Sequence, residues 1–133
     1  MKKIVSIILV MCSVFCVASA VQPSNNVMPL YEHLTGMSAS LEINSIGYAN
    51  AQATATVDPG YNVKVTLELQ KFDNGWTTIS SYTSTGSGIL GTKPYINRFV
   101  VHGTYQAKAT AVVTDSSGNY VETQIATSYV VKY

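Results

Sequence analysis

The sequence predicts an all-β fold, a seven-stranded antiparallel β-sandwich of immunoglobulin or fibronectin type, with a small β-barrel as the alternative. From residue 39 onward, apolar residues recur at every second position, which is the period of a strand with one buried face. Turn-forming Gly, Pro, Asn and Asp residues separate these segments at short intervals. Charged residues make up only 11% of the chain, whereas Ser, Thr and Tyr are abundant, a mixture that favours strands and turns over helices.

The first three predicted strands span residues 38–44, 49–57 and 63–70. The second places alanines on one face and Gln and Thr on the other, until the turn Asp58-Pro59-Gly60. The third carries the strongest apolar row in the chain and should lie at the centre of the core: Val63, Val65, Leu67 and Leu69.

The turn Asp73-Asn74-Gly75 predicts a hairpin between the third and fourth strands, because these residue types accept positive φ. The fourth strand, residues 76–84, is less regular than the others. Simple alternation puts Trp76 and Tyr82 on one face and Ile79 on the other. Either a β-bulge lies between them, or one face carries exposed aromatic side chains.

Three more strands follow a glycine-rich connection at residues 85–92, and they span residues 95–101, 104–113 and 121–133. The last strand comes after a tight turn at residues 115–119, and its expected inward row is Val121, Ile125, Tyr129, Val131 and Tyr133. Alanine rows in the second and sixth strands leave space that we expect bulky neighbours to fill, namely Leu67, Leu69, Phe99 or Trp76.

Residues 1–20 have the pattern of a cleavable signal peptide. Two lysines precede an apolar run over residues 4–17, and Ala18-Ser19-Ala20 provides a small-residue cleavage site. The apolar run is shorter than the roughly 20 residues that span a bilayer. Both cysteines, Cys12 and Cys16, lie within this segment, so the exported chain is predicted to be secreted, free of cysteine and not attached to a membrane.

Residues 21–36 interrupt the alternating pattern with two prolines and a polar run. They predict a flexible N-terminal arm, in which residues 31–34 can form one helical turn. Residues 37–133 then form the β-sandwich domain.

Several stretches of the chain resemble a family of small secreted β-sandwich proteins of unknown function from Gram-positive bacteria. The resemblance covers residues 37–133 and depends on residues 38–43, the alanine-rich second strand, the segments 69–71 and 76–79, and residues 103–109. It implies secretion and a β-sandwich, and it brings no catalytic residues. The segment Gly103-Thr104-Tyr105 also looks like the strand of fibronectin-like sandwiches whose tyrosine hydroxyl bonds to nearby backbone at a corner.

The aromatic residues Trp76 and Tyr82 are the candidate binding residues, since both can stack on sugar rings or anchor a protein partner if they are exposed. The alternative is that Trp76 packs in the core and Tyr82 covers a sheet edge.

No catalytic residue, metal site or cofactor is predicted. The two histidines, His33 and His102, do not lie in a recognisable nucleophile motif. A hydrolase would need His102 to meet an acidic residue in a cleft, or two carboxylates to converge from Glu42, Asp58, Glu68, Asp73, Asp115 and Glu122. The three glutamates of this set are expected to point outward and the three aspartates to open turns.

Asp115, Ser117 and Asn119, with Glu122 nearby, have the spacing that begins a calcium loop. The same residues suit an ordinary hairpin turn, which is the interpretation we favour.

The whole chain has eight basic and seven acidic residues, and the basic residues are scattered. This excludes the clustered basic face that nucleic-acid binding needs. We therefore predict a secreted, non-enzymatic binding or structural protein that acts at or outside the cell envelope. Its expected partner is a cell-wall glycan or another secreted protein. The alternatives are a small secreted hydrolase and a secreted toxin or antimicrobial protein.

Overall fold

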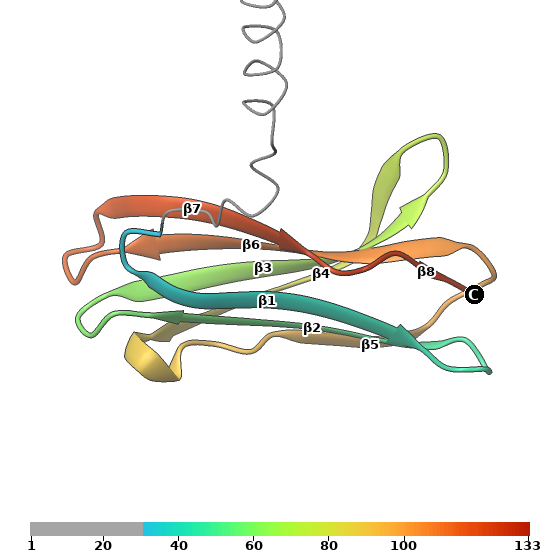
Figure 1. Ribbon diagram of the computed structural model, residues 1–133, viewed down its shortest axis with the longest axis horizontal. Helices are drawn as coiled ribbons and strands as arrows, with labels where there is room; N and C mark the ends of the chain where they lie inside the picture. The colour runs from blue at the N-terminus through green and yellow to red at the C-terminus, as the bar shows by residue number, and fades with distance from the viewer. Residues whose placement is uncertain (1–30) are drawn as a thin grey trace, which may run out of the picture. The chain divides into compact units, whose positions relative to one another are not determined.

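The computed structural model describes residues 31–133, which form two antiparallel sheets packed face to face (Figure 1). The predicted β-sandwich is confirmed, with eight strands in this part of the chain instead of seven. Their bounds are β1 (Leu34–Ile43), β2 (Tyr48–Val57), β3 (Asn62–Phe72), β4 (Trp76–Ser87), β5 (Tyr95–Phe99), β6 (Thr104–Thr114), β7 (Tyr120–Thr127) and β8 (Val131–Lys132). A short 3₁₀ turn, η2 (Gly88–Leu90), precedes β5.

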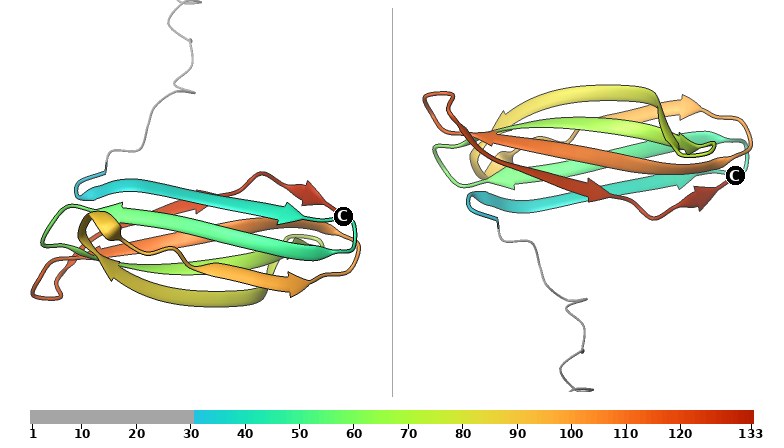
Figure 2. Two further views of the ribbon diagram at one scale, coloured as in Figure 1. Left: turned by 90° about the horizontal axis from the view of Figure 1, so that it is seen from below. Right: turned by 90° about the horizontal axis from the view of Figure 1, so that it is seen from above.

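One sheet has the order β1-β2-β5, and the other has the order β4-β3-β6-β7 with β8 paired to β6. The left view of Figure 2 looks onto the first sheet and the right view onto the second. The chain crosses between the sheets after β2 and again before and after β5. This exchange of strands between layers is typical of the immunoglobulin and fibronectin type of sandwich.

The predicted signal peptide, residues 1–20, and the first ten residues of the predicted arm lie outside the described residues. The arm was expected to extend to residue 36, but β1 already begins at Leu34, which is buried. Residues 31–33 form a bend instead of a helical turn. In the part of the chain that the structure describes, no helix is both long and apolar enough to cross a membrane.

The core confirms the predicted alanine rows. The fully or almost fully buried alanines are Ala49, Ala51, Ala53 and Ala55 of β2 and Ala107, Ala109 and Ala111 of β6. Leu67 and Leu69 of β3 are also completely buried and fill space beside them, as expected. Phe99 and Trp76 do not fill this space, because both are exposed.

The predicted β3–β4 hairpin is present, and Asn74 and Gly75 at its turn have positive φ. Leu69 pairs with Ser80 and Gln70 with Thr78, so Ile79 is an extra residue in β4. The irregular spacing around Ile79 predicted a β-bulge as one of two alternatives, and the register confirms it. Figure 1 shows the end of this hairpin bending away from the two sheets.

The single predicted strand over residues 121–133 is wrong, because it is broken between β7 and β8. At the break, the backbone N–H of Ala107 donates to the Ser128 hydroxyl at 2.8 Å, so a side chain replaces the next backbone acceptor. Of the predicted inward row, Val121 and Val131 pack against the core, whereas Ile125 and Tyr129 are exposed, so the prediction is wrong for these two residues. Ile125 is 58% exposed, whereas Glu122 on the opposite face is only 7% exposed.

The predicted tyrosine corner is confirmed. The Tyr105 hydroxyl donates a hydrogen bond to the carbonyl oxygen of Val101 at 2.6 Å. Burial raises the pKa of the Tyr105 phenol, and the Arg98 charge opposes this only in part, so the hydroxyl remains a donor at neutral pH.

Tyr105→Phe removes the hydroxyl and keeps the buried ring. We expect the free energy of unfolding to fall by about 0.5–1.5 kcal/mol, the net value of one hydrogen bond. Urea unfolding of the purified protein measures this loss. Tyr82→Phe is the control, since the exposed Tyr82 should tolerate the change, and equal losses in both variants would contradict the corner's role.

Ala109→Leu adds three carbon atoms between the two sheets, where Ala109 is completely buried. We expect this overpacking to lower the free energy of unfolding by about 1–3 kcal/mol. Thr110→Leu is the matched control, because Thr110 points away from the core on the same strand and should change stability by less than about 0.5 kcal/mol. A tolerated Ala109→Leu would show that the alanine rows do not set the packing of the sheets.

Candidate binding site

Trp76 and Tyr82, the two predicted site residues, are both exposed but do not lie together. Trp76 pairs with Phe72, and Tyr82 pairs with the buried Leu67. Because the extra residue Ile79 reverses the alternation between them, their side chains point to opposite faces of the hairpin. The expectation that Trp76 packs in the core is wrong, and the two residues do not form one site.

Trp76 instead forms an aromatic pair with Phe72, a residue that the sequence did not single out. The ring centroids lie 5.3 Å apart with an interplanar angle of 67°, an edge-to-face arrangement. Trp76 is 38% exposed and Phe72 is 51% exposed, at the end of the hairpin that bends away from the sheets. The signal in the sequence was the position of Phe72, which flanks the turn opposite Trp76.

An open pocket of about 330 Å³ adjoins the base of this hairpin. Its lining residues are Lys71, Ile79, Arg98, Phe99, Val100, Val101 and Tyr105. Arg98 Nη1 donates to the Ile79 carbonyl at 2.9 Å, which links β5 to the bulge of β4 across the open side of the sandwich. No local sequence pattern indicates this pocket, because its walls come from the four strands β3, β4, β5 and β6 and from the loop before β6.

Lys71 and Arg98 give the pocket a positive rim. Within residues 31–133 the one ion pair found joins His33 to Asp58, so neither cation has a carboxylate partner there. Apolar walls beside two such cations suit an apolar group flanked by a carboxylate. The pocket lies on the core-facing side of β3, where Lys71 pairs with Tyr105, whereas Phe72 and Trp76 lie on the opposite side of the hairpin. We call the pair Phe72–Trp76 together with this pocket the hairpin site, which spans both faces of the hairpin.

A larger hollow of about 540 Å³ separates β1 from β7, and its lining includes Met37, Ala39, Ala126, Ser128 and Tyr129. No charged side chain lines this hollow, and most of its lining side chains are small. It offers less for recognition than the hairpin site does.

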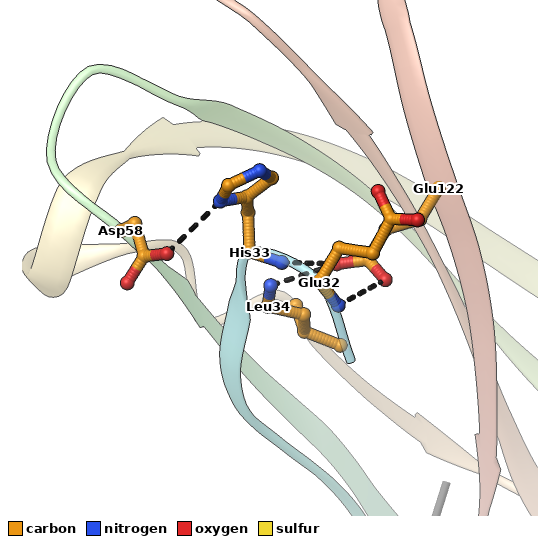
Figure 3. Close-up of polar contacts among 5 residues, drawn as sticks. All are labelled: Glu32, His33, Leu34, Asp58 and Glu122. Carbon is orange, nitrogen blue, oxygen red and sulfur yellow. Dashed lines mark hydrogen bonds and ion pairs between the residues drawn. The ribbon is translucent and has the colours of Figure 1, made fainter. Parts of the chain in front are cut away.

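Glu122 has a structural role that contradicts its predicted outward position. Figure 3 shows its carboxylate accepting hydrogen bonds from three consecutive backbone N–H groups, those of Glu32 at 3.0 Å, His33 at 3.0 Å and Leu34 at 2.7 Å. Burial raises the pKa of Glu122, but these three hydrogen bonds outweigh it and hold the pKa below its usual value. Both carboxylate oxygens are therefore used to hold the beginning of β1 against β7.

His33 strengthens the same contact from the other side. Its Nδ1 lies 3.1 Å from Asp58 Oδ2 (Figure 3). Its ring stacks on Tyr61 with centroids 3.9 Å apart. The backbone N–H of Asp58 donates to the His33 carbonyl at 2.9 Å. These groups fasten the entry into β1 to the turn after β2.

The geometry that the hydrolase alternative requires at His102 is not found among residues 31–133. The His102 ring stacks on Tyr133 with centroids 4.3 Å apart, and no ion pair joins it to a carboxylate in this part of the chain.

Asp115 forms the hairpin turn that we favoured over a calcium loop. Its carboxylate accepts hydrogen bonds from the backbone N–H groups of Ser117 and Asn119, both at 2.9 Å. The bonds from Asn119 and its neighbours lower the pKa of Asp115. Glu122, the additional ligand considered, faces residues 32–34 instead of this turn.

Fold and site together define a β-sandwich with an exposed aromatic hairpin beside a cationic pocket. No protein-family model matches the chain, and no curated protein matches it. Among solved structures, the solution structure of CsgH from R. palustris is similar, with 14% sequence identity and a TM-score of 0.38. The match covers 69% of this chain and 90% of that chain, and the likeness is too distant to bear on function.

Glu122→Gln replaces the carboxylate with an amide that has one acceptor oxygen and brings a donor toward the three N–H groups. At pH 7 we expect the free energy of unfolding to fall by about 1–3 kcal/mol. Because the folded-state pKa of Glu122 is lowered, its stabilising contribution is complete above the unfolded-state pKa of about 4.3 and is lost as the pH falls through the folded-state pKa.

The difference between wild type and Glu122→Gln should therefore shrink in acid, as measured by urea unfolding from pH 7 to pH 3. Glu42→Gln is the control, since Glu42 is exposed on β1 and makes no such contacts. A difference in the free energy of unfolding that stays constant over this pH range would argue against a stabilising role for the ionised Glu122 carboxylate.

Proposed function

We propose that this protein is a secreted, non-enzymatic binding protein that acts at or outside the cell envelope and holds another secreted protein through the hairpin site. The observation that carries the proposal is the exposed Phe72–Trp76 pair at the end of a bent hairpin, whose opposite face borders a pocket with two cations.

Two exposed aromatic rings in contact provide a ready anchor for a binding partner. Trp is among the residues most enriched in the energetic centres of protein interfaces, where it fills a pocket and excludes water. Lys71 and Arg98 add the charge that would select an acidic partner surface and speed its approach. The partner we propose therefore presents an apolar side chain next to one or more carboxylates.

The extracellular setting rests on the sequence. Residues 1–20 have the pattern of a cleavable leader, and the chain resembles a family of secreted proteins from Gram-positive bacteria. Cleavage after residue 20 would remove both cysteines, and a domain without cysteine suits export, since it cannot form wrong disulfides.

Trp76 is the only tryptophan of the chain, so its fluorescence reports directly on the hairpin site. We expect wild-type protein to capture a partner from the secreted proteins of the producing organism, and purified partner to shift Trp76 emission on titration. Lys71→Gln should raise the Kd for the partner and make this Kd less dependent on salt concentration, because the substitution removes one cation from the pocket.

Trp76→Ala should weaken capture at least about tenfold, as for an interface residue worth more than about 1.4 kcal/mol. Tyr129→Ala is the matched control, because Tyr129 is as exposed as any aromatic residue described but lies between β7 and β8. Equal retention of the partner by wild type and Trp76→Ala would refute the hairpin site as the point of contact.

A further inference from the structure

The outward side of the sheet β1-β2-β5 carries a second group of exposed side chains. Alternate alanines of β2 are buried, so the residues between them point away from the core. We call this surface the β1–β2–β5 face and define it by Glu42, Tyr48, Asn50, Gln52, Tyr95 and Phe99.

Aromatic rings stand at both ends of this face. Tyr48 pairs with Phe99 in the strand register, and their rings meet edge to face with centroids 4.9 Å apart. Tyr95 lies on the same side of β5, four residues before Phe99, which is about 13 Å along a strand. Both β5 aromatic residues are more than half exposed. The face therefore offers two separate aromatic platforms.

Polar groups fill the space between the platforms. A small hollow of about 90 Å³ is lined by Ser40, Glu42, Asn50 and Gln52. A second hollow of about 220 Å³ shares Gln52 with the first and is bordered by Tyr95. The two hollows thus follow the face from its centre to the Tyr95 platform.

Asn50 in the first hollow has an unsatisfied hydrogen-bonding atom. Its Oδ1 is buried and has no hydrogen-bond partner among the described residues. A buried amide oxygen without a partner costs free energy. Because this oxygen is shielded from solvent, a donor of a bound molecule reaches it only when the Asn50 side chain turns toward the hollow, and the new hydrogen bond then offsets that cost. Gln52 and Ser40, in the same hollow, can both donate and accept.

The ligand chemistry follows from these groups. Sugar hydroxyls both donate and accept hydrogen bonds, and so do the hydroxyls of this face at one atom and its amides at two. The C–H faces of sugar rings stack on aromatic rings. Only Glu42 and Lys93 are charged among the residues lining the two hollows, so no cluster of cations is present to hold phosphates. A protein interface would instead have its apolar residues gathered at the centre.

We propose that the β1–β2–β5 face binds a neutral glycan. Sugar rings stack on Tyr95 and on the Tyr48–Phe99 pair, and their hydroxyls bond to Asn50 and Gln52 between them. The site is separate from the hairpin site except for Phe99, which borders both. It goes beyond the proposed function, because one chain would then hold a glycan on the β1–β2–β5 face and a protein at the hairpin site.

The test begins with the purified full chain on an array of neutral oligosaccharides built from glucose, galactose, mannose and N-acetylglucosamine. The tightest binder is then titrated by calorimetry. Tyr95→Ala and Gln52→Ala should each raise the Kd for the oligosaccharide about tenfold, equivalent to about 1.4 kcal/mol for a lost contact. Circular dichroism and urea unfolding establish that both variants remain folded.

Tyr120→Ala is the matched control, since Tyr120 is an exposed tyrosine on β7 of the other sheet, and its Kd should equal that of wild type. Trp76 emission should not change on glycan binding, because Trp76 lies on the hairpin of the other sheet. The proposal is overturned if no oligosaccharide binds, if Tyr95→Ala binds as tightly as wild type, or if Trp76→Ala abolishes binding. The last outcome would place the glycan at the hairpin site instead.

Discussion

The close approach of two alanine-lined strands is the constraint on which the rest of this structure depends. β2 and β6 present buried alanines to the space between the sheets, and the buried hydrophobic residues that share it with them are Leu, Val, Ile96 and one aromatic residue. Tyr105 is the one buried aromatic side chain among residues 31–133. A core this narrow has no room for further rings, because protein interiors are filled to the density of crystals. The other aromatic residues must therefore lie partly or largely at the surface, and the candidate binding surfaces have their origin in this constraint.

The narrow, alanine-lined core leads to both proposed surfaces, in different ways. On the hairpin, the bulge at Ile79 turns Trp76 away from the sheet and beside Phe72, where the two rings shield one another only in part. On the β1–β2–β5 face, the same alternation that buries the alanines of β2 exposes Tyr48 and the amides between them. The same alternation thus places small residues in the core and aromatic residues at the surface. The sandwich holds both candidate surfaces on a rigid frame.

Glu122 provides a second constraint, at the edge where β1 meets β7. A buried carboxylate is tolerated only when its hydrogen bonds replace those of water, and here three backbone N–H groups of residues 32–34 do so. This contact explains why β1 begins at Leu34 and why the alternation of β7 is the reverse of what its apolar residues indicated. The exposure of Ile125 is the cost of placing Glu122 inside.

The sequence by itself determined the features that depend on neighbours along the chain. Period-two alternation located the strands, Asp73-Asn74-Gly75 the hairpin and Tyr105 the corner, because strand faces and tight turns are set by a few adjacent residues. Only the tertiary structure decided which face of β7 is buried, where the last strand breaks and how Arg98 reaches β4 to form the pocket. Each of these depends on a partner far away in the sequence, such as residues 32–34 for Glu122, and no local pattern records it. Trp76 and Tyr82 illustrate both cases. The sequence predicted their exposure as one of two outcomes. Only the pairing of β4 with β3 showed that Ile79 is an extra residue, which places the two side chains on opposite faces of the hairpin.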